Sequence, residues 1–523
     1  MNKNKFFIYM ISTLLLIPIF SSAQTLRVSE NKRFLDDENG APFLYLGDTA
    51  WELFHRLNRE EANLYLKNRA EKEFTVIQAV VLAENDGLRT PNMYGEVPLH
   101  NLDPAQPNEA YFEHVDYIVN KAAELDLFIG MLPTWGDKVT DVHGGSGPVV
   151  FTPENAKIYG KFLGKRYKDK PIIWILGGDR NVDNENVLNI WRAMAQGIEE
   201  GMNGKQLITY HPRGSYSSSY WLHNEPWLDF NMYQSGHGGS FTRVYEMAEE
   251  LSLLKPVKPF VDGEPAYEDI AVRFWEYCDW SNPKRAPDSV LNEQGLIKDR
   301  SHFKDGFITD YDVRVHAYWN FLAGACGYTY GNNAIWQMYK TGGPIAIPCL
   351  TDWKNALDRP GSGDIKHIRN LFEARPISKL APDQSIIYGV NPKDSTHLRA
   401  AGSTDHSFLL VYAAVGQPFT VVMGKISGEK VIAHWYDPRT GEITKVGQFP
   451  NSGLKTFSPP SSGNDNDWLL LLDDASANYP LPGPQANSWK FFSPDKNLKV
   501  KVNNTQNRLT YEVLLKSGQD YKA

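Results

Sequence analysis

Cysteine is scarce in this chain of 523 residues, and the three present, Cys278, Cys326 and Cys349, are widely spaced. An odd, scattered set of thiols excludes a disulfide framework as the main source of stability. A basic excess is also missing, because the formal net charge is −8. That acidic balance excludes nucleic acid as the expected partner, since nucleic-acid binding needs a basic face.

Several catalytic motifs are absent as well. The chain has no His-Glu-x-x-His, no Gly-x-Ser-x-Gly, no P-loop and no cysteine pair at metal-binding spacing. These absences argue against a zinc protease, a serine hydrolase of the nucleophile-elbow type and a P-loop nucleotide-binding protein. We therefore expect neither a metal nor a cofactor.

One apolar run stands apart at the N-terminus. It extends from Phe6 to Phe20, follows Lys3 and Lys5, and precedes Ser21-Ser22-Ala23. This is the pattern of a secretory signal peptide over residues 1–23, cleaved after Ala23. The run is shorter than the ~20 residues that a membrane span needs. We expect a periplasmic or secreted protein with no membrane span after cleavage.

Eight short apolar runs, separated by helical patterns, dominate residues 24–352. They are FLYLGD (43–48), FTVIQAVVL (74–82), LFIGMLPTW (127–135), IIWILGGD (172–179), QLITYHP (206–212), FNMYQSG (230–236), PFVDGE (259–264) and GYTYG (327–331). Thr152-Pro153 fits a helix N-cap followed by proline at the first helical position. Alternating strands and helices favour right-handed parallel units. We predict an α/β fold whose catalytic domain is a (β/α)₈ TIM barrel.

From residue 353 to 475 the pattern changes to short strands with turn signals. The expected strands are SIIYGV, FLLVYAAV, FTVVMG, KVIAHWYDP, EITKV and DWLLLLD. They predict an antiparallel β-sandwich domain. Residues 476–523 then hold a linker, ANYPLPGPQANS, and two further strands, LKVKV (498–502) and LTYEVLL (509–515). Two strands make only a marginal unit, so we interpret this end as a truncated β segment.

Two of the apolar runs lead directly into a carboxylate. Asp179 follows the fourth predicted strand and Glu264 the seventh. In a barrel of parallel strands the chemistry lies where the strands end, and two carboxylates are the minimum for cleaving a glycosidic bond. Structural roles remain open: Asp179 could cap a helix or pair with Arg180, and Glu264 could pair with Lys255 or Lys258.

Other strand ends carry polar or aromatic side chains suited to a sugar site, which needs flat apolar faces with a few hydrogen-bonding groups. The predicted substrate-binding residues are Asp48, Trp51, Gln78, Trp135, Asp137, Arg180, His211, Tyr233, Gln234, Tyr330 and Trp336. Each could instead belong to the core. We also expect the GGSG segment at 144–147 to form a flexible loop over the barrel mouth.

The chain from about Leu26 to Asp474 resembles the apiosidase-like glycoside hydrolases, glycoside hydrolase family 140. The matching phrases are GDTAWELF (47–54), FTVIQAVVLAE (74–84), NEAYFEHVDYIV (108–119), IGMLPTWGDK (129–138), WILGGDRN (174–181) and VDGEPAYE (261–268). The resemblance implies a retaining mechanism with Asp179 as acid/base and Glu264 as nucleophile. It also implies a pectic oligo- or polysaccharide substrate, with apiose in side chains of rhamnogalacturonan II as the family's sugar.

Two weaker resemblances concern the rest of the chain. HWYDPRTGE (434–442) and DWLLLLD (467–473) are similar to the collagen-binding domain of a collagenase. No protease signature accompanies them, so we expect a structural module that packs on the barrel. The tail is similar to the opening strands of the N-terminal sandwich of glycoside hydrolase family 97, without the remainder of that domain.

The favoured hypothesis is a glycoside hydrolase. Two alternatives stay open: a non-catalytic polysaccharide-binding protein, and a matrix-binding adhesin that acts through the β-sandwich. An exposed aromatic strip on the sandwich, away from the barrel, would favour the adhesin. Oligomeric state, the exact sugar and linkage, and exo or endo action cannot be read from these residues.

Overall fold

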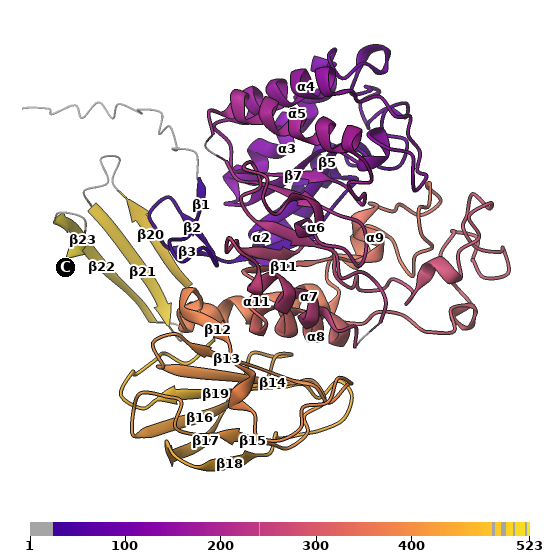
Figure 1. Cartoon of the computed structure of the whole chain (residues 1–523). Coiled ribbons are helices and arrows are strands. Elements are labelled where there is room, and N and C mark those ends of the chain that lie inside the picture. Colours follow the sequence, from indigo (N-terminus) through magenta and orange to yellow (C-terminus); the bar gives the residue numbers. More distant parts are fainter. Residues whose placement is uncertain are drawn as a thin grey trace, which may run out of the picture. The chain divides into compact units, whose positions relative to one another are not determined.

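Eight parallel strands form the centre of the first domain, as predicted (Figure 1). The structure is a computed structural model that describes residues 25–204, 206–239, 241–483, 487–492, 498–505, 508–517 and 520–522. The barrel strands are β4 (Tyr45–Thr49), β5 (Val76–Leu82), β6 (Phe128–Thr134), β7 (Ile172–Gly177), β8 (Ile208–His211), β9 (Asn231–Tyr233), β10 (Phe260–Asp262) and β11 (Gly327–Tyr330). Every residue of these strands is buried, because the strands are covered on both faces.

Helices follow the strands and form the outer layer of the barrel. They are α1 (Leu53–Arg56) and α2 (Arg59–Glu71) after β4, α3 (Glu109–Glu124) after β5, α4 (Pro153–Tyr167) after β6, α5 (Glu185–Met202) after β7, α6 (Ser219–Leu222) after β8, α7 (Val244–Leu253) after β9, α8 (Asp310–Leu322) after β10, and α9 (Asn333–Trp336), α10 (Trp353–Ala356) and α11 (Pro360–Ala374) after β11. Four 3₁₀ turns lie in the connecting loops: η1 (His100–Leu102), η2 (Gly136–Lys138), η3 (Phe274–Glu276) and η4 (Arg300–His302). The predicted cap at Thr152 is confirmed, since its side chain accepts a hydrogen bond from Asn155 N at the start of α4.

The strand order is β8-β7-β6-β5-β4-β11-β10-β9, so β8 and β9 are the two ends of the sheet. They meet through two hydrogen bonds, from Thr209 Oγ1 to Phe230 O (2.7 Å) and from Asp229 N to Ile208 O (2.9 Å). These contacts close the barrel, so the carboxyl ends of all eight strands lie at one end of it. We call that end the barrel mouth.

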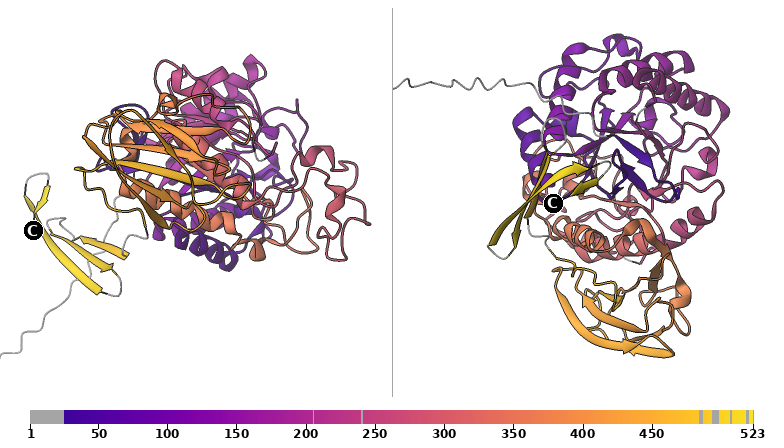
Figure 2. Two further views of the ribbon diagram at one scale, coloured as in Figure 1. Left: turned by 90° about the horizontal axis from the view of Figure 1, so that it is seen from below. Right: turned by 90° about the vertical axis from the view of Figure 1, so that its left-hand side faces the viewer.

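The opposite end of the barrel is covered by a small antiparallel sheet of β1 (Leu26–Val28), β2 (Leu35–Asp37) and β3 (Pro42–Phe43), as Figures 1 and 2 show. A turn at Asn39-Gly40 joins β2 to β3, and Gly40 adopts a positive φ of 82° there. Phe43 packs edge-on against Phe128 at the start of β6, with ring centroids 5.2 Å apart.

The second domain contains two antiparallel sheets. One has the order β12-β13-β14-β19-β16-β17 and the other pairs β15 with β18. Their bounds are β12 (Leu380–Pro382), β13 (Leu398–Ser403), β14 (Phe408–Ala413), β15 (Phe419–Val422), β16 (Lys430–Tyr436), β17 (Ile443–Pro450), β18 (Leu454–Phe457) and β19 (Trp468–Asp474). The strand predicted at SIIYGV is wrong: a 3₁₀ turn, η6 (Gln384–Ile386), occupies it. A further 3₁₀ turn, η5 (Ile377–Lys379), joins α11 to β12.

Alternate residues of β14 face opposite ways. Phe408, Leu410 and Tyr412 belong to the same hydrophobic core as the barrel residues. Leu409, Val411 and Ala413 face the core between the two sheets of the sandwich. Both faces of this strand are therefore buried, which explains its continuous apolar sequence. The sandwich is packed on the barrel through a shared core, as we expected of a structural module.

Residues 487–522 form a separate four-stranded sheet within the described ranges. Its strands are β20 (Asn487–Phe492), β21 (Leu498–Thr505), β22 (Arg508–Ser517) and β23 (Asp520–Lys522), in that order. The two strands predicted here are confirmed, but β20 and β23 were missed. The predicted signal peptide, residues 1–23, lies outside the described residues. Among the residues that are described, no helix is long and apolar enough to cross a membrane.

Candidate active site

Asp179 reaches the barrel mouth through an unusual end to β7. Gly177, Gly178 and Asp179 have consecutive positive φ angles of 90°, 98° and 51°. A Cβ on Gly177 would lie 2.3 Å from the carbonyl oxygen of His211, so only glycine fits. Gly178 N donates to the same oxygen over 3.1 Å. The two glycines let the end of β7 lie against β8 and turn Asp179 out of the strand.

Glu264 is placed by the end of β10 and its two neighbours. Gly263 N donates to Tyr233 O over 2.8 Å, and Gly236 N donates to Glu264 O over 3.0 Å. From inside the barrel, Gln78 Nε2 donates to Gly263 O over 2.8 Å. The predicted residue Gln78 thus holds the peptide that precedes Glu264, and the backbone around Glu264 is fixed on three sides.

Two imidazoles face the Glu264 carboxylate. His211 Nε2 lies 3.1 Å from Oε2, and His237 Nε2 lies 3.3 Å from Oε1. Asp179 N donates to His211 Nδ1 over 3.2 Å. Because Nδ1 must accept that hydrogen bond, the proton of neutral His211 belongs on Nε2, the nitrogen that lies 3.1 Å from Glu264 Oε2. One imidazole therefore joins the residue after β7 to the residue after β10.

The two carboxyl groups have opposite pKa shifts. Burial raises the pKa of Asp179 to about 6, and the negative charge of Glu264 adds to that rise. Burial also acts to raise the pKa of Glu264, but His211 and His237 outweigh it and hold this pKa at about 2. Between these values Asp179 keeps its proton while Glu264 is ionised, which divides the pair into an acid and a base.

The structural roles that the sequence left open are only partly realised. Arg180 Nη1 does lie 3.4 Å from Asp179 Oδ2, so this ion pair exists, but 31% of the Asp179 side chain remains exposed. Asp179 is not a helix cap, since Asn184 caps α5. Lys258 donates to the carbonyl oxygens of Leu228 and Glu225 instead of pairing with Glu264.

Aromatic side chains surround His211. Trp51 and Trp135 lie with ring centroids 5.3 Å apart, and each packs on the His211 ring, at 5.5 and 6.0 Å. Tyr267 packs on His237 with ring centroids 4.4 Å apart. Burial and the charge of Glu264 raise the pKa of Tyr267 well above its usual value. These rings are almost fully buried, so they form the floor of the site.

Arg180 and Asp137 serve the loop at 144–147. Arg180 donates to Gly144 O, and Asp137 Oδ2 accepts from Gly147 N over 2.9 Å. Arg89 also donates to Ser146 O over 3.0 Å. The flexible loop that we expected over the mouth is therefore tethered at three points. Asp137 is also paired with Lys138 over 2.7 Å, so its role is to anchor this loop.

Three predicted substrate-binding residues lie between the sheet and the helices instead of at the site. Asp48 contacts Arg69 Nε and Tyr65 Oη of α2, each at 2.5 Å. Tyr330 donates to Glu268 Oε2 over 2.6 Å and packs on Phe74. Tyr233 bonds Asn320 of α8. These predictions are wrong for one reason: alternate residues of a barrel strand face outward, toward the helices.

Two further predicted residues lie at the rim. Gln234 follows β9, and its backbone bonds Ser215 and Tyr216 of the preceding loop. Trp336 ends α9, and its carbonyl accepts from Glu52 N over 3.2 Å. Neither residue has a recorded contact with Asp179 or Glu264 among the described residues.

Three residues near the carboxylate pair were not predicted from the sequence: His237, Tyr267 and Glu84. Glu84 follows β5, where Lys138 Nζ bonds the carbonyl oxygens of Ala83 (2.7 Å) and Glu84 (3.4 Å). Burial and then the charge of Asp179 raise the pKa of Glu84 well above its usual value. A signal existed for this residue, since it is a carboxylate directly after an apolar strand. His237 lies in a loop, where no periodicity marks it.

Within the described residues, no group of three or more His, Cys, Asp or Glu side chains is arranged to hold a metal ion. The chemistry available at the mouth is that of two carboxyl groups with opposite protonation, two imidazoles and an aromatic floor. A (β/α)₈ barrel with such a pair at the ends of its fourth and seventh strands has the organisation of a glycoside hydrolase.

The comparison with known families agrees. Residues 29–379 match the family described as "Apiosidase-like, catalytic domain", and the chain belongs to this family. Residues 381–473 match a family described as "Putative collagen-binding domain of a collagenase". The family and fold together make the protein a glycoside hydrolase.

Solved structures give the same class. One described as "Glycoside hydrolase" is 35% identical, with a TM-score of 0.74, and the match covers 87% of this chain and 98% of that one. A glycoside hydrolase family 5 structure from Bacteroides vulgatus ATCC 8482 is 33% identical, with a TM-score of 0.75 and coverage of 87% and 94%. No curated protein matches the chain.

Proposed function

We propose that this protein is a retaining glycoside hydrolase in which Glu264 is the nucleophile and Asp179 the acid/base. The observation that carries the proposal is the placement of both carboxyl groups at the barrel mouth, where His211 contacts Asp179 N (3.2 Å) and Glu264 Oε2 (3.1 Å). Their pKa values move apart accordingly, to about 2 for Glu264 and about 6 for Asp179. A retaining enzyme needs one ionised carboxylate and one protonated carboxyl group at the same anomeric centre.

In the first step the Glu264 carboxylate attacks the anomeric carbon while Asp179 gives its proton to the departing glycosidic oxygen. The glycosidic bond breaks and a glycosyl ester forms on Glu264. Asp179 is then negative, and the esterified Glu264 no longer carries a charge beside it. In the second step Asp179 takes a proton from water, the water oxygen attacks the anomeric carbon, and the ester bond to Glu264 breaks.

His211 and His237 have a defined part in this cycle. Their contacts at 3.1 and 3.3 Å keep Glu264 ionised before attack and stabilise it again when it leaves the sugar. Asp179, with about a third of its side chain exposed, can exchange its proton with water between steps.

We propose a pectic glycan, with apiose-containing side chains as the first candidate, as the substrate. The apiosidase-like family supports this choice. The charge of Arg213 acts on Asp179, and no carboxylate in the described part of the chain is paired with the Arg213 side chain. A guanidinium without a carboxylate partner at this place suits an acidic polysaccharide. A secreted or periplasmic location, predicted from residues 1–23, would bring the enzyme to such a substrate.

The test is sugar release from a panel of pectic oligosaccharides by the wild type, Asp179→Asn and Glu264→Gln, with melting temperatures measured in parallel. We expect release of a monosaccharide or short product by the wild type only. If the wild type and both variants all bind the oligosaccharide and none of them, including the wild type, releases a product, the polysaccharide-binding alternative is supported and the proposal is overturned. The adhesin alternative is not favoured, because the exposed large apolar side chains across described residues 380–474 are Tyr388, Val390, Val446 and Leu454, which form no aromatic strip.

A further inference from the structure

A lobe of the barrel domain, residues 271–307, projects from the loop between β10 and α8 on the side of the barrel mouth (Figures 1 and 2). Its two ends are joined at a narrow neck, where Asp269 N donates to Ile308 O (2.9 Å) and Val272 N to Gly306 O (3.0 Å). Long connections of this kind in compact domains are usually functional. The lobe begins three residues after Glu268 and so stays close in sequence to Glu264.

The lobe has its own small core. Ala286, Val290, Leu291, Ile297 and Phe303 are buried together inside it. Arg273 and Tyr277 both bond Asp305 Oδ2, at 2.6 and 2.5 Å, across the base. These contacts tie the two ends of the lobe together beside the neck.

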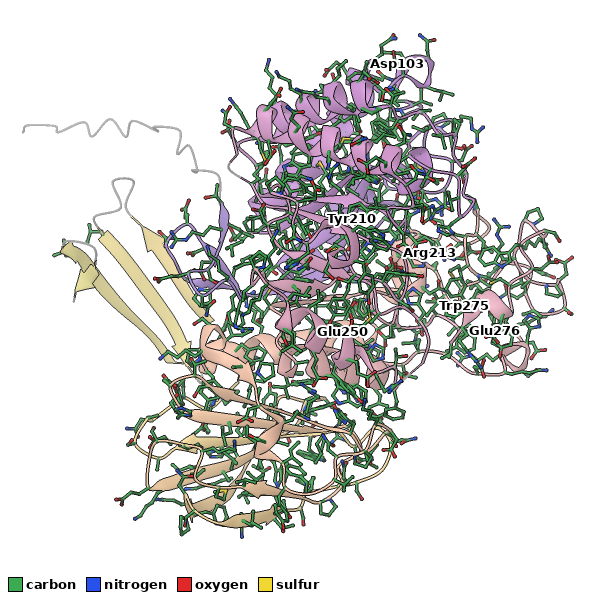
Figure 3. All side chains as sticks on the ribbon, in the orientation of Figure 1. Asp103, Tyr210, Arg213, Glu250, Trp275 and Glu276 are labelled. Carbon is green, nitrogen blue, oxygen red and sulfur yellow. The ribbon has the colours of Figure 1, made fainter. Side chains whose placement is uncertain are left out.

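Two tryptophans stand on the surface of the lobe. Trp275 is 46% exposed and Trp280 is 53% exposed, and Figure 3 shows Trp275 and Glu276 on the projecting lobe. Arg285 lies over one face of Trp280, 5.5 Å from the ring centre, and donates to its carbonyl over 2.8 Å. Arg285 therefore covers one face of the Trp280 ring. The exposed part of this residue is the part that Arg285 does not cover. Both rings pack on Phe274, and large exposed apolar side chains that lie together with polar residues around them are typical of binding surfaces.

A continuous series of ring contacts links these tryptophans to the catalytic pair. His237 touches Glu264 and packs on Phe274, with centroids 5.9 Å apart. Phe274 in turn packs on Trp275 at 5.3 Å and on Trp280 at 6.3 Å. In addition, Arg273 N donates to His237 O over 3.0 Å. The tryptophans are thus anchored to the wall of the site that carries Glu264.

We propose that Trp275 and Trp280 form a carbohydrate-binding platform for sugar units of the glycan chain that lie beyond the scissile bond. The proposal rests on the proposed function and names a binding surface for the same substrate. Flat indole faces suit the CH faces of sugar rings, and the charged neighbours Arg273 and Glu276 suit their hydroxyl groups. A protein partner fits less well, because two rings among charges lack the contiguous apolar core of a stable interface.

The kinetic test compares Trp275→Ala, Trp280→Ala and the double variant with the wild type on pectic oligosaccharides of increasing length. For the double variant we expect KM to rise about tenfold on the longest substrate, which corresponds to about 1.4 kcal/mol. On the shortest hydrolysed substrate kcat/KM should stay unchanged. Tyrosine at both positions should restore most of the affinity. The matched control is Tyr388→Ala, an aromatic residue that is 58% exposed on the sandwich.

A second measurement separates this proposal from the proposed function. In the Glu264→Gln background, migration through a gel that contains rhamnogalacturonan reports binding without turnover. Retardation that the double tryptophan variant loses supports the platform, even if the wild type hydrolyses no pectic bond. Unchanged retardation, an equal loss of kcat/KM at every substrate length, or a change of oligomeric state in the double variant would each overturn the platform.

Discussion

Carboxylates gather in two regions of this molecule, at the barrel mouth and at the contact between barrel and sandwich. At the contact, Arg314 of α8 bonds Asp310, Asp364 and Asp467. Burial raises the pKa of Asp364 to about 7 even though Arg314 opposes the rise. A raised carboxyl pKa therefore occurs in both regions and does not by itself identify a catalytic site.

The two regions differ in what the carboxyl groups face. At the contact they share one guanidinium, and Asp467 is completely buried. At the mouth Glu264 faces two imidazoles while Asp179 is partly exposed, and the two pKa values move apart. Opposite pKa shifts of two carboxyl groups at the barrel mouth, with access to solvent, distinguish the proposed reactive pair from the structural cluster.

The largest expected effect is loss of activity on removing either carboxyl group at the mouth. Asp179→Ala and Glu264→Ala should each lower kcat/KM on a natural glycan by about 10³-fold or more, because proton donation and the covalent intermediate are lost in turn. An aryl glycoside with an acidic phenol needs no proton donor, so Asp179→Ala should still undergo the first step and show a burst of phenol. Glu264→Ala should show none, and a burst from that variant would reverse the two roles.

Removing Arg314, the cation at the contact between barrel and sandwich, should lower the stability of the protein and leave its activity unchanged. Arg314→Met leaves Asp467 buried without its charged partner, and breaking such a pair costs about 3–5 kcal/mol. We expect a lower melting temperature with an unchanged kcat for the folded enzyme. The control is Arg192→Met on exposed α5, where the ion pair with Glu225 should contribute at most about 1 kcal/mol. Equal destabilisation by both variants would contradict the comparison.

The barrel strands show how much of the fold and of the site could be predicted from the sequence. The eight barrel strands and the position of both carboxylates at strand ends were predictable, because strands buried on both faces read as apolar runs. Because every residue of these strands is buried, the sequence did not show which side chains point into the barrel and which point toward the helices. Asp48 and Tyr330 resemble Gln78 in sequence context, yet they face α2 and Glu268 while Gln78 faces the barrel interior. No alternation of polar and apolar residues exists to tell these directions apart.

A smaller effect is expected from His237. His237→Gln removes one imidazole from Glu264, so the pKa of Glu264 should rise above about 2. The acidic limb of kcat/KM against pH should then move to higher pH, so that kcat/KM falls at the lowest pH values and stays unchanged at pH 5.5. His143→Gln is the control at the mouth, since His143 lies beside Asp183 instead of Glu264. An acidic limb unmoved by His237→Gln would remove this residue from the account.

The smallest effect concerns stability and pH at Asp179. Its pKa of about 6 in the folded state lies above the ordinary value of about 3.9. The folded state therefore gains stability from the bound proton below about pH 4 and loses it as the pH rises through 6. Asp179→Asn mimics the neutral carboxyl group. At pH 8 its free energy of unfolding should therefore be about 1 kcal/mol higher than that of the wild type, allowing for the partial exposure of Asp179. Urea unfolding at pH 8 and pH 4 checks this, and a gap of the same size at both values would contradict it.

The most direct test of the central claim is the pH dependence of kcat/KM for the wild type on a hydrolysed pectic oligosaccharide. If Glu264 is ionised and Asp179 protonated in the active form, kcat/KM should be level near pH 4–5 and fall tenfold per unit above about 6. A value of kcat/KM that stays constant up to pH 8 would show that no protonated Asp179 is required, and it would contradict the assignment of the pair.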